Sequence, residues 1–129
     1  MRPEKILLVE DHPDHREVIQ MQLKFLGWES EIAVDGEEAL EKVKTTLPEV
    51  ILLDIMIPKI NGFEVARSLR KNPEYRDIPI LAVTALAAPA DRERCLRAGC
   101  DDYLAKPFTH HDLKKRLDSL LSKDRHSLH

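Results

Sequence analysis

The chain has 129 residues and a formal net charge of -3, with 33% charged and 43% hydrophobic residues. This length fits one domain, and this balance fits a folded globular protein rather than a disordered one. The weak net charge argues against direct binding to nucleic acid or to anionic membranes, no apolar run could span a membrane, and the N-terminal residues do not resemble a signal peptide. The two cysteines show no metal-binding spacing with histidine, so we expect a reducing compartment, the cytoplasm.

The first half of the chain predicts two strands and two helices. The apolar run at residues 5–9 is typical of a strand that is buried on both faces. A helix over residues 13–26 follows, with proline at its start and glycine just after its end. Residues 28–34 alternate enough to form a strand, and their acids favour an edge position. A capping box then opens a helix over residues 35–45.

The second half continues this alternation. Its apolar runs predict three more strands, and its Asn-Gly, Pro and capping-box signals predict three more helices. These elements are, in chain order, a strand at 50–53, a helix at 62–72, a strand at 78–83, a helix at 89–98, a strand at 102–105 and a helix at 110–121.

Five alternations of strand and helix predict an α/β fold, with a parallel sheet covered by helices on both faces. No internal repeat or linker marks a second domain. We therefore expect a single domain over residues 1–129, with its core at about residues 5–121 and a frayed polar tail at residues 122–129.

Polar residues stand where four of the five predicted strands end: Glu10 with Asp11, Asp54, Thr84 and Lys106. Parallel strands bring their carboxyl ends to one edge of the sheet, so these side chains should converge. Three neighbouring carboxylates repel one another unless a cation lies among them, and Mg²⁺ prefers such ligands. Asp54 is the candidate nucleophile for a phosphoryl group, whose oxygens Lys106 and Thr84 would contact.

The chain resembles the receiver domain of two-component response regulators over nearly all of its length. The resemblance rests on the acidic pair after the first strand, on Asp54 with Pro58 and Gly62 four and eight residues later, on Thr84-Ala85 and on Lys106-Pro107-Phe108. It implies a flavodoxin-like sheet with strand order 2-1-3-4-5. It also implies phosphoryl transfer to Asp54, assisted by Mg²⁺, from a sensor histidine kinase or a phosphotransfer protein.

The resemblance also implies a role for each metal-site residue. Asp11 and Asp54 would ligate the metal directly, and the backbone carbonyl of Met56 would complete the protein's share. Glu10 would hold a metal-bound water. Glutamate at this position, where aspartate is also common in the family, leaves that chemistry intact.

Further positions match the family's signalling residues. Tyr103 matches the switch aromatic, whose ring turns inward when Thr84 moves toward the phosphate. Four charged residues resemble positions that pair across dimers through the fourth helix, fifth strand and fifth helix. We expect this face to carry the output, as a homodimer or as a docking surface, and its residues are Arg94, Asp102, Asp112 and Arg116.

The expected function is a switch that acts on a downstream protein and has no substrate beyond its own phosphorylation and dephosphorylation. An aspartate-nucleophile phosphatase of the haloacid dehalogenase type would need a second aspartate where Met56 stands. Flavin binding would need a loop rich in Ser, Thr and Gly where the acids follow the first strand. Met1 and the polar tail favour a stand-alone receiver over a fragment of a DNA-binding regulator or hybrid kinase.

Overall fold

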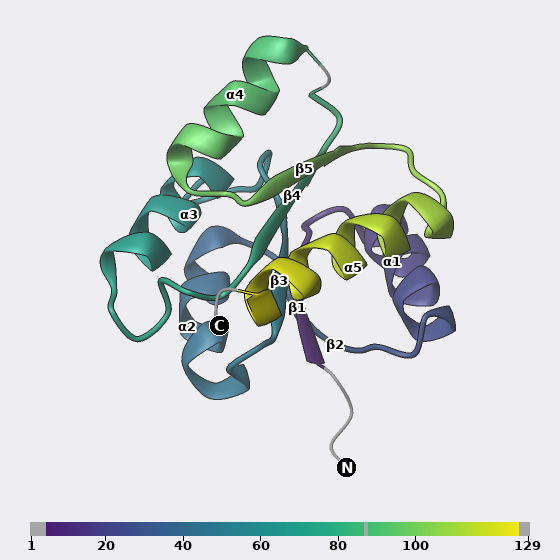
Figure 1. Cartoon of the computed structure of the whole chain (residues 1–129). Coiled ribbons are helices and arrows are strands. Elements are labelled where there is room, and N and C mark those ends of the chain that lie inside the picture. The colour runs from purple at the N-terminus through teal and green to yellow at the C-terminus, as the bar shows by residue number, and fades with distance from the viewer. Residues whose placement is uncertain (1–4, 87, 127–129) are drawn as a thin grey trace.

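Strands and helices alternate throughout the computed structural model, which describes residues 5–86 and 88–126, with side chains to residue 122 (Figure 1). The strands are β1 (Lys5–Val9), β2 (Glu29–Ala33), β3 (Val50–Asp54), β4 (Ile80–Thr84) and β5 (Asp102–Ala105). The helices are α1 (Pro13–Phe25), α2 (Gly36–Thr46), α3 (Gly62–Lys71), α4 (Pro89–Ala98) and α5 (His110–His126).

The strands form one parallel sheet in the order β2-β1-β3-β4-β5, which confirms the predicted fold. Its register aligns the carboxyl ends of neighbouring strands. Val9 pairs with Leu53, and Thr84 pairs with Ala105. The residues that follow β1, end β3 and β4, and follow β5 therefore lie at one edge of the sheet.

Two apolar layers hold the sheet between its helices. Side chains of a strand alternate between the two faces, so Leu7 and Leu53 pack toward α2, α3 and α4, while Leu8 and Leu52 pack toward α1 and α5. Figure 1 shows these two groups of helices on opposite sides of the sheet. All four side chains are fully buried, as expected for the middle of a doubly covered sheet.

Helix α1 buries only part of its apolar surface. Ile19 and Leu23 pack into the core, but Val18, Met21 and Phe25 are 55%, 66% and 74% exposed. Exposed side chains of this size on one helix favour a protein contact there.

Two element boundaries differ from the prediction by more than one residue. Strand β4 begins at residue 80 rather than 78, because the N–H of Ile78 donates to Tyr75 in a turn. Helix α5 continues to residue 126, so the predicted frayed tail is helical over residues 122–126, and its last residues, 127–129, lie outside the described part. No glycine or proline follows Leu121, and Ser, Lys, Asp and Arg can all continue a helix. In the described residues, no helix is long and apolar enough to cross a membrane.

Gly62 brings α3 against the end of β3. Its N–H donates to the carbonyl of Ile55 at 3.0 Å, and a Cβ at this position would lie 2.5 Å from the Cα of Ile55 and 2.8 Å from the carbonyl oxygen of Asp54. Asn61 caps the helix by accepting a hydrogen bond from the N–H of Glu64 at 3.0 Å. A glycine is required here because any side chain would push the helix away from Asp54.

Candidate functional site

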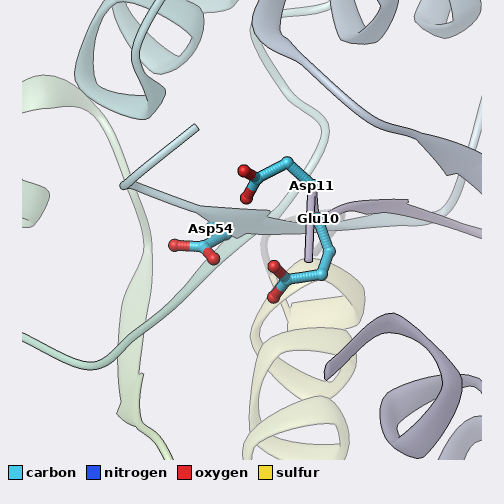
Figure 2. A group of neighbouring side chains, drawn as sticks. All are labelled: Glu10, Asp11 and Asp54. Carbon is cyan, nitrogen blue, oxygen red and sulfur yellow. The ribbon is translucent and has the colours of Figure 1, made fainter. Parts of the chain in front are cut away.

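Three carboxylates converge at the carboxyl edge of the sheet. Glu10 and Asp11 follow β1 directly, and Asp54 ends β3. One oxygen of each lies within 4.8 Å of the others, and Figure 2 shows the three side chains directed toward a common space. Glu10 and Asp54 are buried, whereas Asp11 is exposed. Such a group of hard oxygen donors, open on one side, suits a divalent cation.

Lys106, just after β5, reaches into this acidic cluster. Its ammonium Nζ lies 2.9 Å from Oδ2 of Asp54 and donates a second hydrogen bond to Oε1 of Glu10. A third contact, 3.2 Å long, runs to Nδ1 of His15 on α1. Only 11% of the lysine side chain is exposed, so the positive charge is held mainly by these neighbours. These contacts agree with the prediction that Lys106 converges with Glu10 and Asp54 at this edge of the sheet.

The electrostatics of the cluster follow from burial and pairing. Burial raises the pKa of Glu10 above its ordinary value, and the hydrogen bond from Lys106 opposes this shift only in part. Burial alone would lower the pKa of Lys106, but its hydrogen bonds to Glu10 and Asp54 outweigh that effect and raise the pKa. Lys106 is therefore a firmly protonated ammonium at neutral pH.

Asp54 and Thr84 are each fixed by the backbone that follows them. The N–H of Met56 donates to Oδ1 of Asp54 at 3.0 Å, which leaves Oδ2 to Lys106. Thr84 is fully buried at the end of the neighbouring strand, and its Oγ1 accepts a hydrogen bond from the N–H of Leu86 at 3.2 Å. The structure thus places Met56 beside the site, while the role of its carbonyl as a metal ligand stays a prediction.

Tyr103 is linked to Thr84 through one loop residue. Its ring is buried in the core, with 8% of the residue exposed, and its hydroxyl donates to the carbonyl of Leu86. Because the N–H of Leu86 binds Thr84, a movement of the threonine would be felt at the tyrosine hydroxyl. The ring already points inward here, and the predicted switching stays a prediction.

The four charged residues of the predicted output face have partners within the chain. Arg116 donates to Asp102 at 2.8 Å, and Asp112 caps the start of α5. The guanidinium of Arg94 lies over the ring of Phe63, 4.4 Å from its centroid. All four lie on α4, β5 and α5, as predicted, but a contact with another molecule would have to compete with these internal pairs.

Two features of the site were not foreseen. His15 contacts Lys106, and a groove of about 380 Å³ opens beside this pair, between α1 and the loop after β5. Apolar side chains of Val18, Ile19 and Phe108 line much of it. Helical spacing placed His15, Val18 and Ile19 on the predicted helix, but only the fold brings that face of α1 against residues 106–108.

Comparison with known sequences identifies the family. The family model for the response regulator receiver domain matches residues 6–118. The transcriptional regulatory protein TrcR of Mycobacterium tuberculosis is 40% identical over 124 residues, which cover 96% of this chain and 48% of TrcR. The response regulator MprA of Mycolicibacterium vanbaalenii is 40% identical over 121 residues, which cover 94% of this chain and 52% of MprA. The chain thus spans about half the length of these curated relatives.

Solved structures agree with this assignment. The receiver domain of a Pseudomonas aeruginosa sensor histidine kinase, with a magnesium ion coordinated in its active-site cleft, superposes with a TM-score of 0.87 at 37% identity, covering 94% of this chain and 99% of that one. The Vibrio cholerae chemotaxis protein CheY4 superposes with a TM-score of 0.85 at 32% identity, covering 92% of this chain and 99% of that one.

Proposed function

The chain belongs to the response regulator receiver domain family, and we propose that it is a phosphorylation-dependent switch of a two-component system. Asp54 accepts a phosphoryl group, and altered contacts with a downstream protein transmit the signal. The observation that supports this most directly is the position of Asp54, paired with Lys106 at 2.9 Å beside two further carboxylates. Apart from its own phosphorylation and dephosphorylation, the protein has no substrate.

The chemistry uses groups that are already in place. An oxygen of Asp54 attacks phosphorus, a new P–O bond forms, and the bond from phosphorus to the donor's leaving group breaks with its electron pair on that group. The ammonium of Lys106 and the hydroxyl of Thr84 stabilise the charge on the phosphoryl oxygens. The Met56 N–H keeps the carboxylate oriented throughout.

The acidic cluster fits Mg²⁺. Glu10, Asp11 and Asp54 offer hard oxygen donors within 4.8 Å of one another, and Glu10 is fully buried. Asp11 and Asp54 would hold the ion directly together with the Met56 carbonyl, and Glu10 would act through a water. When bound, the ion neutralises charge on the phosphoryl group. The magnesium site of the related Pseudomonas receiver supports this assignment.

A sensor histidine kinase or a phosphotransfer protein is the proposed donor. The groove lies beside Lys106, which contacts Asp54, and the exposed Val18, Met21 and Phe25 continue its apolar surface along α1. Such a surface suits a protein that must bring its phosphoryl group to this edge. The proposed cytoplasmic location rests on the two cysteines, Cys95 and Cys100, which are buried and free.

The central test is phosphorylation by acetyl phosphate with Mg²⁺. We expect the intact mass of the chain to increase by one phosphoryl group, and we expect Asp54→Asn to abolish the increase. Asp11→Ala should lose both Mg²⁺ binding and phosphorylation while its circular dichroism spectrum stays that of the parent. A phosphatase would instead release phosphate over many turnovers without a stable adduct. Equal labelling of the Asp54→Asn variant would refute the proposal.

The phosphorylated state is expected to be long-lived. In the family, the residues two past the phosphorylated aspartate and two past the threonine border the path of the attacking water. Here these are Met56 and Leu86, which cannot orient a water by hydrogen bonding. Met56→Asn combined with Leu86→Glu should therefore lose phosphate about tenfold faster than the parent. The measurement is the decay of labelled protein after the donor is removed, and equal decay rates would contradict the prediction.

The face formed by α4, β5 and α5 is the proposed output surface. Phosphorylation should promote either a homodimer or docking of a partner there, and exposed ion pairs worth up to about 1 kcal/mol each would set register more than affinity. Sedimentation should show dimerisation, or a pull-down should show partner binding, and Arg94→Glu should weaken it. A phosphorylated protein that stays monomeric and binds its partner unchanged in Arg94→Glu would argue against this surface.

A further inference from the structure

The ammonium of Lys106 has three N–H donors, and three acceptors surround it. Oε1 of Glu10 and Oδ2 of Asp54 accept two of them, the second at 2.9 Å. The third contact is Nδ1 of His15, at 3.2 Å. The histidine thus completes the coordination of the lysine that would bind the phosphoryl group.

The direction of this third hydrogen bond follows from the charge on the lysine. Nζ of Lys106 binds two carboxylates, and a lysine ammonium has three N–H donors and no lone pair, so it can only donate. Nδ1 of His15 must then present its lone pair. A hydrogen bond between these two atoms thus requires that the ring proton of His15 be on Nε2.

The ring of His15 is held by its neighbours. It stacks on the ring of His12 with a centroid separation of 4.2 Å and an interplanar angle of 17°. His12 is itself fixed by two hydrogen bonds. Its Nδ1 accepts from the backbone N–H of Asp14 at 3.2 Å, and its backbone N–H donates to Oε2 of Glu10 at 3.1 Å. The start of α1 therefore ties the imidazole to the same carboxylate that binds Lys106.

We propose that His15 is a positioning residue for the phosphorylation of Asp54, because its Nδ1 anchors one N–H of Lys106 and keeps the ammonium aimed at the site of the incoming phosphoryl group. The inference rests on the proposed function. A lysine side chain has many rotamers, and a third anchor restricts them before the donor arrives. His15 is exposed, so water replaces part of the lost hydrogen bond when the imidazole is removed, and the effect should be moderate.

The test compares two substitutions of similar size. Asparagine places an oxygen at the position of Nδ1, whereas leucine has no acceptor. With acetyl phosphate and Mg²⁺ at about pH 8, where a free imidazole is neutral, His15→Leu should be phosphorylated roughly three- to tenfold more slowly than the parent. His15→Asn should stay within about twofold of the parent. His111→Leu, at an exposed histidine on α5, is the matched control and should match the parent.

A second measurement is independent of phosphorylation. Nitrogen NMR of the metal-free protein should show an unprotonated Nδ1 for His15, assigned by its loss in His15→Leu, and this signal should shift in Lys106→Met. A protonated Nδ1, a His15→Leu variant as fast as the parent, or a His15→Asn variant as slow as His15→Leu would overturn the inference. A folded parent that takes up no phosphate at all would instead overturn the proposed function, and the positioning role with it.

Discussion

Replacing Lys106 with methionine is expected to slow phosphorylation of Asp54 by acetyl phosphate about a hundredfold to a thousandfold, the range seen when one preorganised donor to a developing negative charge is removed. Methionine keeps the unbranched stem but cannot donate a hydrogen bond. The 2.9 Å contact to Asp54 and the contact to Glu10 are lost together, and no other described cation is hydrogen-bonded to both carboxylates. The rate is measured by intact mass over time at saturating Mg²⁺.

The matched control is Lys115→Met, which removes an exposed lysine from α5. It should be phosphorylated at the parent rate. If Lys106→Met were slowed less than about tenfold while Lys115→Met behaved as the parent, the ammonium would not be the main stabiliser of the phosphoryl charge.

Lys106→Met should also change how the free energy of unfolding depends on pH. Burial raises the pKa of Glu10 above its ordinary 4.5 in the folded protein, so the folded state binds more protons than the unfolded state in that range. The stability that this carboxyl contributes is thus complete below pH 4.5 and is lost as pH rises through the folded pKa. Without Lys106 the pKa of Glu10 rises further. The free energy of urea unfolding of the metal-free variant should therefore fall more between about pH 5 and about pH 8 than that of the parent. Glu10→Gln combined with Lys106→Met should not show the additional loss.

The fold could be predicted because its signals are local. An unbroken apolar run that ends in a polar residue indicates a strand covered on both faces, and β3 is buried at all five positions. Right-handed crossovers then bring the strand ends to one edge, which was enough to place Asp54 and Lys106 together without any distance information. The resemblance added the strand order, which the sheet confirms.

The rest of the site depends on contacts between distant residues. His15 and Lys106 are 91 positions apart, and no periodicity or cap connects them. The exposure of Val18 and Phe25 could not be predicted either, because an apolar residue on a helix has the same spacing whether it faces the core or a partner.

Arg70 shows how much of the stability lies in such distant contacts. Its Nε donates to the carbonyl of Gly99 at 2.8 Å, its Nη1 donates to the carbonyls of Arg76 and Ile78 at 2.7 and 2.8 Å, and its Nη2 binds Oδ2 of Asp101 at 2.6 Å. One guanidinium therefore joins the end of α3, the turn before β4 and the segment after α4. Its side chain is only 23% exposed, so water can replace these bonds only in part.

Arg70→Ala should lower the free energy of unfolding by about 2–4 kcal/mol, because four acceptors, two of them in partly buried hydrogen bonds, lose their donor at once. Arg70→Lys should recover less than half of this loss, since an ammonium cannot reproduce the planar fork that reaches both sides of the turn. Urea unfolding gives both values. The control is Arg67→Ala at an exposed position of the same helix, which should stay within about 0.5 kcal/mol of the parent.

The effect of Lys106→Met on phosphorylation and the effect of Arg70→Ala on stability should be independent, because the two residues lie at opposite ends of the parallel strands. Asp101 also accepts a hydrogen bond from the N–H of Ile80 at 2.8 Å, so the Arg70 contacts gather at the amino ends of β4 and β5, away from Asp54. At a temperature where it is still folded, Arg70→Ala should therefore be phosphorylated at the parent rate. If a folded Arg70→Ala variant lost phosphorylation as Lys106→Met does, the contacts at the amino ends of the strands would control the geometry of Asp54. In the described part of the chain, no hydrogen bond of Arg70 reaches Asp54 or Lys106.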